Sequence, residues 1–308
     1  MTTAPTTFSS RVILVARDIK LSHSVFALPF ALLATFMAAA SRTENPLPRW
    51  STVFLIIVCM FLARTVAMMI NRWADAKIDA DNPRTAKRAI PSGNLSRRFV
   101  LMGAIVCAAA FVAAAGGFWL INENPWPLML SPVVLAWLCV YSFMKRYTWL
   151  CHLILGSALA LSPLAAAVAV EPAYLSIAEP YLLAVMVMCW VAGFDVIYAL
   201  QDVSVDREQG LFSMPSRLGE NASLWISRIL HAISIAALAA LWHFNGLLDI
   251  AFLVGVIIVA ALIVLEHALV WGSKTNHINM AFFTLNGVIS LLLGGLGIFD
   301  VVRANGSL

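Results

Sequence analysis

Long apolar stretches separated by short polar connections run through the whole sequence. Nine of them are long enough to cross the roughly 30 Å hydrocarbon core of a bilayer as helices. They lie near residues 23–40, 51–70, 99–121, 126–144, 150–170, 180–200, 223–243, 247–271 and 279–301. The pattern predicts an all-α polytopic membrane protein, with about nine transmembrane helices in one domain over residues 1–308. In the N-terminal segment, residues 1–20, we expect a short helix on the membrane surface.

Composition excludes a soluble fold. Apolar residues make up 61% of the chain and charged residues 12%, about half of the roughly 25% typical of soluble domains. Mean hydropathy is +0.88, so the apolar residues are not confined to one anchor. The five cysteines lack the close spacing of a zinc site. The net charge of +4 is not by itself a sign of nucleic-acid binding, and we expect membrane lipid, not nucleic acid, around the protein.

The basic residues predict the orientation of the chain. If the N-terminus is cytoplasmic, 15 of the 20 Lys and Arg residues fall in the N-terminal segment or in cytoplasmic connections. Such an excess of Lys and Arg on the cytoplasmic side is the rule for membrane proteins. We therefore expect a multi-pass protein of the bacterial inner (cytoplasmic) membrane, with its N-terminus in the cytoplasm and its C-terminus outside.

The acidic residues are concentrated in two connections. Half of the 16 carboxylates lie in residues 71–98 and 195–220, which follow the second and sixth apolar stretches. Each connection contains a D-x-x-x-D motif, Asp75 with Asp79 and Asp202 with Asp206. The two copies are offset by about 127 residues, which predicts an internal repeat of about four helices. Repeats in membrane proteins commonly place the functional site where the two halves meet.

Each motif predicts a polar stripe, because residues four apart share one face of a helix. The stripes are Asn71, Asp75 and Asp79 on the second span, and Tyr198, Asp202 and Asp206 on the sixth, with Asp195 one level deeper. Two acidic stripes that face each other repel, so we expect a cation between them. Oxygen ligands favour Mg²⁺ or Ca²⁺, and Mg²⁺ typically completes its shell with waters and substrate phosphates.

Basic residues around the stripes indicate an anionic ligand. They are Arg72, Lys77, Arg84, Lys87, Arg88, Lys145 and Arg146. Carboxylates for a metal together with Arg and Lys for oxygen anions are typical of a diphosphate site. The ring of Tyr198 shares its stripe with Asp202, so it is placed to stabilise a carbocation that develops near a leaving diphosphate.

The paired motifs resemble those of the UbiA superfamily of intramembrane prenyltransferases. Residues 71–79 (NRWADAKID) with 82–85 (NPRT) are similar to its first motif, and residues 195–206 (DVIYALQDVSVD) to its second. Residues 141–148 (YSFMKRYT) and 26–30 (FALPF) are similar to stretches of its 4-hydroxybenzoate polyprenyltransferase branch. The resemblance covers roughly residues 20–300. One departure is Arg72, where many members carry an aspartate directly after the asparagine.

This resemblance implies nine helices around a central cavity, Mg²⁺, a polyprenyl diphosphate donor and a small aromatic acid as acceptor. It implies that Asn71, Asp75 and Asp79 hold one Mg²⁺ and that Asp202 and Asp206 hold a second. Asp195, Tyr198 and Arg146 are then the expected catalytic residues, with Asp195 as a base for the phenol or the ring proton. The expected diphosphate contacts are Arg72, Lys77, Arg84, Arg88, Lys145 and Arg146, of which the last two could instead hold the acceptor carboxylate.

The acceptor stays open between two aromatic acids. One is 4-hydroxybenzoate for ubiquinone, and the other is 1,4-dihydroxy-6-naphthoate for menaquinone by the futalosine route. A different class, an ion-coupled secondary transporter, also combines repeats with intramembrane carboxylates. The transporter is disfavoured because the acids cluster near one membrane edge, together with phosphate-type bases.

Overall fold

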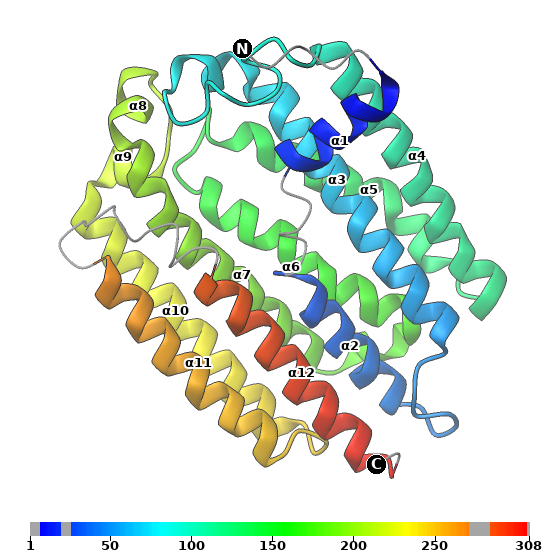
Figure 1. Ribbon diagram of the computed structural model, residues 1–308. Coiled ribbons are helices and arrows are strands. Elements are labelled where there is room, and N and C mark those ends of the chain that lie inside the picture. Colours follow the sequence, from blue (N-terminus) through cyan, green and yellow to red (C-terminus); the bar gives the residue numbers. More distant parts are fainter. Residues whose placement is uncertain (1–6, 20–25, 271–283, 307–308) are drawn as a thin grey trace.

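The computed structural model describes residues 7–19, 26–270 and 284–306, and every regular element within them is a helix (Figure 1). Within these described residues, eight helical segments are long and apolar enough to cross a membrane. They correspond to α3 (Trp50–Asp81), α4 (Arg97–Asn122), α5 (Trp126–Met144), α6 (Cys151–Val170), α7 (Glu179–Ala199) with its extension, α10 (Glu220–Phe244), α11 (Ile250–Leu269) and α12 (Asn286–Ala304). The prediction of an all-α polytopic membrane protein is confirmed.

The first expected span is shorter than predicted. Its helix, α2, runs over Leu28–Ala40, and 13 residues rise only about 20 Å. Pro29 lies in the first turn, where a proline costs no helical hydrogen bond. The earlier part of the predicted stretch includes residues 20–25, and the start of the last predicted stretch includes residues 279–283, both outside the described residues. Nine is therefore an approximate count, made of eight long helices and one short one.

A buried layer in the bundle is built on α7. This helix packs against α6 and α10, while α2 packs against α6 and α12. Trp190 of α7 is almost fully buried, and its ring packs edge-on against Phe30 of α2 at 5.4 Å between centroids. A side chain at Gly156 of α6 would place its Cβ 2.3 Å from the carbonyl oxygen of Met188, so the glycine permits the close contact of α6 with α7.

The helix α3 is much longer than a bilayer requires. Its 32 residues rise about 48 Å, so the last turns extend past the apolar part and carry the first motif. The helix ends at Asp81 because Asn82, the residue before Pro83, is extended with φ −101° and ψ 117°. Thr85 then donates its hydroxyl to the carbonyl oxygen of Asp79 and closes the turn.

The stripe of Tyr198, Asp202 and Asp206 predicted one continuous α-helix, but the second motif is interrupted by a 3-10 turn. The 3-10 turn η3 (Leu200–Asp202) follows α7 and leads into the short helix α8 (Val203–Glu208). A 3-10 turn has three residues per turn, so the four-residue spacing no longer keeps these side chains in line. Asp202 instead pairs with Arg84, and Asp206 pairs with Lys145.

The remaining elements lie mostly at one end of the bundle. The N-terminal helix α1 (Phe8–Asp18) crosses this end near α3 and α4, and α8 and α9 (Met214–Leu218) lie at the same end (Figure 1). The C-terminal end of α12 and the 3-10 turn η2 (Pro172–Ser176) belong to the opposite end. A helix within residues 1–20 agrees with the expected N-terminal segment. Val15 of α1 packs in a small core with Met69 and Val100.

Candidate active site

One cavity of about 760 Å³ gathers residues of both motifs. Eleven of the predicted site residues line it, namely Asn71, Arg72, Asp75, Asp79, Arg84, Arg88, Lys145, Asp195, Tyr198, Asp202 and Asp206. The cavity lies where α3 ends, where α7 turns into α8, and beside the connection that follows α5. Two motifs about 127 residues apart in the sequence therefore share one site, while the repeat itself stays a prediction.

Each expected metal-binding carboxylate is paired with a basic side chain. Asp75 accepts from Arg146 at 2.7 Å and Asp79 from Arg88 at 2.7 Å. The other two pairs are Asp202 with Arg84 at 2.5 Å and Asp206 with Lys145 at 2.7 Å. The repulsion that the sequence predicts between the acidic stripes is thus offset by the chain's own cations.

The pair of Asp202 and Arg84 joins the two motifs directly. Arg84 donates from Nε to Oδ1 at 2.9 Å and from Nη2 to Oδ2 at 2.5 Å, a bidentate contact. Asn82 adds a third hydrogen bond to Oδ1 at 3.0 Å, and Nη1 of Arg84 donates to the hydroxyl of Tyr198 at 3.0 Å. Burial alone would lower the pKa of Arg84, but the hydrogen bonds and charge of Asp202 outweigh it and raise that pKa.

Asp206 is almost fully buried and connects three elements. Its Oδ1 accepts from Lys145 at 2.7 Å, and its Oδ2 accepts from the hydroxyl of Ser213 at 2.6 Å. Ser213 is also the N-cap of α9, where its hydroxyl accepts from the backbone of Ser216. Burial acts to lower the pKa of Lys145, but the charge of Asp206 raises it above its usual value, so the lysine stays a cation.

Asp75 lies in a chain of polar contacts that reaches the N-terminal helix. Asn71 donates to Asp75 at 2.8 Å, and Arg72 donates to the amide oxygen of Asn71 at 2.8 Å. Arg72 is buried and forms an ion pair with Asp18 of α1 at 3.4 Å. The oxygen with which Asn71 would bind a metal is therefore occupied, and Arg72 is paired with a residue outside both motifs.

Two predicted diphosphate contacts do not line the cavity. Lys77 is exposed, because it follows Asp75 by two residues on α3 and so points to the other side of the helix. The structure therefore does not bring Lys77 together with the other predicted site residues, and its contact with the diphosphate stays a prediction. Arg146 does not line the cavity but donates to Asp75, which does. It also donates to the carbonyl oxygens of Ala74 and Ser142, each at 3.0 Å.

Three residues of the cavity were not singled out from the sequence. Asn82 binds Asp202, His152 contacts Asp195 at 2.6 Å, and Arg64 lies on the cavity wall deeper along α3. Asn82 is part of the NPRT segment, so its position was a usable signal. His152 and Asp195 are 43 residues apart with no motif between them, and no pattern in the sequence links them.

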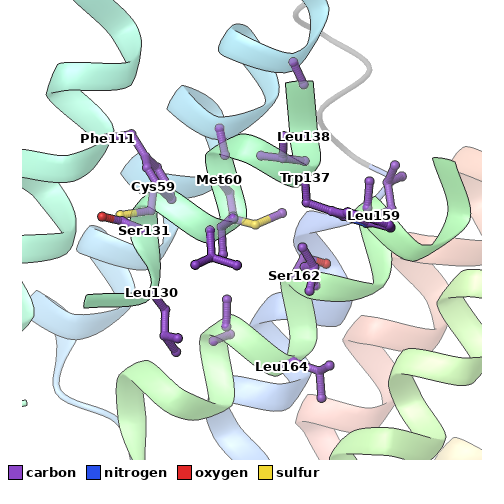
Figure 2. A pocket seen from close by; sticks show the side chains of 18 of the residues that line it. Cys59, Met60, Phe111, Leu130, Ser131, Trp137, Leu138, Leu159, Ser162 and Leu164 are labelled. Carbon is purple, nitrogen blue, oxygen red and sulfur yellow. The ribbon is translucent and has the colours of Figure 1, made fainter. Parts of the chain in front are cut away.

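A second, apolar cavity of about 670 Å³ adjoins the first (Figure 2). Side chains of α3, α4, α5 and α6 line it, among them Met60, Phe111, Trp137 and Ser162. The two cavities share five lining residues: Arg64, Met68, Tyr141, Leu155 and Leu159. Both volumes fall in the range of about 300–1,000 Å³ typical of ligand sites. The combined space suits a molecule with an anionic head and a long apolar tail.

The donor atoms of the first cavity suit a hard cation. Oxygen atoms of Asp75, Asp79, Asp202 and Asp206 surround the space, together with the amide of Asn71. Within the described residues, no three Asp, Glu, His or Cys side chains converge closely enough to hold a metal by themselves. Mg²⁺ needs only one or two protein carboxylates when phosphate and water supply the rest, so this donor set fits Mg²⁺ that is shared with a diphosphate.

A helical membrane bundle in which an ion-pair-lined cavity adjoins an apolar one has a site suited to a lipid with a charged head. Residues 27–288 match the model of the UbiA prenyltransferase family. The chain therefore belongs to the UbiA prenyltransferase family and is a prenyltransferase, as the resemblance implies.

Relatives and solved structures agree with this assignment. The 4-hydroxybenzoate octaprenyltransferase of Citrobacter koseri is 29% identical over 251 residues, which cover 81% of this chain and 83% of the relative. The apo structure of a UbiA homologue from Aeropyrum pernix K1 has a TM-score of 0.80 at 31% identity, covering 91% of this chain and 98% of that one. A UbiA homologue from Archaeoglobus fulgidus bound to GPP and Mg²⁺ shares the fold, with a TM-score of 0.70 at 19% identity over 94% of this chain and 99% of that one.

Proposed function

We propose that this enzyme transfers a polyprenyl chain from polyprenyl diphosphate to the ring of 4-hydroxybenzoate, in ubiquinone biosynthesis. The observation that carries the proposal is the adjoining pair of cavities, one lined by ion pairs and one by apolar side chains. The first would receive the diphosphate and the second the prenyl tail. The name of the Citrobacter koseri relative supports 4-hydroxybenzoate as the acceptor.

The charged cavity would bind the diphosphate together with Mg²⁺. Asp75 and Asp79 would hold one ion and Asp202 and Asp206 another, with Asn71 assisting at the first. When bound, Mg²⁺ supplies Lewis-acid stabilisation of the leaving diphosphate. Arg84, Arg88 and Lys145, the basic partners of these carboxylates, would then contact the diphosphate oxygens, which suit bidentate and point-charge donors alike.

The acceptor would lie where the two cavities meet. Arg64 lines both cavities there, and its buried Nε has no hydrogen-bond partner among the described residues. Its charge would hold the acceptor carboxylate. Tyr198 and Asp195 lie one turn apart on α7, where they would orient the acceptor ring. The Tyr198 ring would also face the carbocation that develops at the donor.

The chemistry is an electrophilic substitution. Heterolysis breaks the bond between the first prenyl carbon and the diphosphate oxygen, and the electron pair leaves with the diphosphate. A ring carbon of the acceptor then bonds to the prenyl carbon and loses its proton to Asp195. The apolar side chains around the junction, Leu155 and Leu159 among them, exclude water that would otherwise capture the cation.

Placement in the membrane follows from the charge distribution. We propose the bacterial inner membrane, with the N-terminus and the charged cavity on the cytoplasmic side, where polar substrates are made. The expected asymmetry of 15 of the 20 basic residues supports this orientation. Fusion of a reporter active only in the cytoplasm to each terminus tests it: activity at the N-terminus and none at the C-terminus is expected.

The activity is tested with purified protein in detergent. We expect diphosphate release from a polyprenyl diphosphate only when Mg²⁺ and 4-hydroxybenzoate are both present, with prenylated acceptor formed in equal amount. Product from 1,4-dihydroxy-6-naphthoate but not from 4-hydroxybenzoate would assign the menaquinone acceptor instead. Ion flux in proteoliposomes without diphosphate release would mark a transporter and overturn the proposal.

A further inference from the structure

One aspartate of the charged cavity differs from the others in its partner. The four motif aspartates are paired with Arg or Lys, whereas Asp195 is paired with a histidine. His152 Nδ1 lies 2.6 Å from Oδ2 of Asp195, and both residues line the cavity. The histidine side chain is only 4% exposed and that of the aspartate 23%. The pair therefore forms part of the cavity wall, with the carboxylate as its more exposed member.

The contacts of His152 fix the orientation of its ring. The backbone N–H of Met214 donates to Nε2 at 3.3 Å, and an amide nitrogen cannot accept in return. Nδ1 faces Asp195, and its N–H is donated to Oδ2 of that carboxylate. The ring of His152 is thus held between Asp195 on one side and the backbone of Met214 on the other.

The anchor of His152 belongs to the second motif region. Met214 is fully buried in the first turn of α9, directly after the N-cap Ser213. Ser213 also donates to Asp206, so the same turn that holds the histidine is tied to a proposed metal ligand. The orientation of His152 is thus set by the backbone of a structured turn and not by a mobile side chain.

The contact with His152 leaves one oxygen of Asp195 able to take a proton. A carboxylate bound to Arg or Lys is stabilised in its charged form and becomes a weaker base. Asp195 receives one hydrogen bond, from His152 on Oδ2, and among the described residues its Oδ1 has no hydrogen-bond partner. Within the described chain, every oxygen of the four motif aspartates accepts from a side chain, so Oδ1 of Asp195 differs from all of them.

We propose that His152 is a positioning residue that holds Asp195 with Oδ1 toward the acceptor ring, so that this oxygen receives the ring proton. The inference rests on the proposed function and deepens it. After the new carbon–carbon bond forms, the proton leaves the same ring carbon, its bonding electrons restore the aromatic ring, and Asp195 becomes a neutral acid. The proton then passes to water at the cavity mouth, and the proton on Nδ1 of His152 does not move.

Two substitutions separate the two hydrogen bonds of His152. In His152→Asn the amide nitrogen occupies the place of Nδ1, so the contact with Asp195 is kept and that with Met214 is lost. In His152→Gln the longer side chain reaches Met214 in place of Nε2, and the contact with Asp195 is lost. A purely structural histidine has no reason to favour Asn over Gln, since Asn leaves a buried backbone N–H without a partner.

The test measures kcat, the KM of each substrate, the melting temperature in detergent, and the isotope effect on kcat with 4-hydroxybenzoate deuterated at the ring positions next to the hydroxyl. We expect His152→Gln to lose about tenfold or more in kcat, since positioned acid–base groups contribute about 10²–10⁴-fold. Its donor KM should stay within about twofold, and a primary isotope effect should appear because proton removal becomes rate-limiting. His152→Asn should keep kcat within about threefold while melting at a lower temperature.

His231→Gln is the matched control, because His231 is a buried histidine that lines neither cavity. It should lower the melting temperature and leave the isotope effect at the wild-type value. The inference is overturned if His152→Asn is as impaired as His152→Gln, with kcat following melting temperature and no isotope effect in either. Wild-type protein that prenylates no aromatic acid would instead overturn the proposed function, and the role of His152 with it.

Discussion

The pair of Arg84 and Asp202 places the chain's own cation in competition with a metal. Arg84 contacts both oxygens of Asp202, at 2.9 and 2.5 Å, and occupies the atoms that would bind Mg²⁺. Replacing Arg84 by methionine keeps much of the side-chain volume and removes the competitor. Mg²⁺ should then bind more tightly in the absence of donor, whereas the donor should bind more weakly because its diphosphate loses a cation.

The size of the effect follows from the geometry of the pair. Hydrogen bonds to charged groups contribute about 1.5–3 kcal/mol each when buried. The Arg84 side chain is 31% exposed and that of Asp202 8%, so solvent screens part of the interaction. We therefore assign about 1.4–2 kcal/mol to the bidentate contact as a whole, which is roughly a tenfold to thirtyfold change in an equilibrium constant.

Two measurements on the same purified variant check both signs. Calorimetric titration with Mg²⁺ and no donor should give a Kd about tenfold lower in Arg84→Met than in wild type. Steady-state kinetics at saturating Mg²⁺ and acceptor should give a donor KM at least about tenfold higher. Lys77→Met, which removes an exposed cation outside the cavity, should change neither value. If Mg²⁺ and donor affinity weaken together, Arg84 is only a structural tie and the competition does not exist.

Four further predictions concern other parts of the site. Asp75→Ala and Asp202→Ala should each leave less than about a tenth of the transfer activity, which is a loss above roughly 1.4 kcal/mol in transition-state stabilisation. Each variant should elute from gel filtration at the wild-type volume. Activity above that level in either variant would exclude a metal-binding role for the substituted aspartate. Arg146→Ala should lower kcat/KM roughly tenfold to a hundredfold, because Asp75 loses its basic partner. Arg146→Lys should recover only part of this loss, because an ammonium group cannot form the same fork of hydrogen bonds. If lysine restores the full activity, the charge only anchors the loop. Ser162→Phe should fill part of the apolar cavity and raise KM about tenfold for a long polyprenyl diphosphate but not for geranyl diphosphate. An equal effect on both substrates would place the prenyl tail outside this cavity. The pKa of Lys145 is raised above 10.5, so its stabilising ion pair should be constant near neutral pH and be lost only as pH rises through that pKa. The difference in melting temperature between wild type and Lys145→Met should therefore shrink only at such high pH. A difference that disappears by pH 9 would contradict the ion pair.

Much of the fold could be predicted from the sequence because lipid leaves few alternatives. Every backbone group in the hydrocarbon region must be hydrogen-bonded within its own segment, so a long apolar stretch is a helix. The one short stretch, α2, departs because it is an inner helix: Phe30, Ala31 and Leu33 are all fully buried. A helix covered by other helices need not match the thickness of the bilayer.

The site was predictable in its composition but not in its pairings. Spacing of four residues placed Asp75 and Asp79 on one face of α3, and both line the cavity. The partner of each carboxylate comes from a distant part of the chain, as Arg84 and Asp202 do across 118 residues. Such pairings depend on how helices pack, and a 3-10 turn at Asp202 further changes which side chains are in line. Neither is encoded in local spacing.

The two acidic stripes do not require a metal for charge balance, because the cavity also contains many basic residues. Six aspartates and seven Lys or Arg residues line it, so the cavity is close to neutral before any substrate enters. Asp18 of α1 is one of the six, and it pairs with Arg72, the residue directly after Asn71. A nearly neutral cavity attracts neither free Mg²⁺ nor free diphosphate strongly. A complex of Mg²⁺ with the diphosphate would carry both charges and could exchange partners with the ion pairs of the four motif aspartates, so we expect metal and donor to enter together.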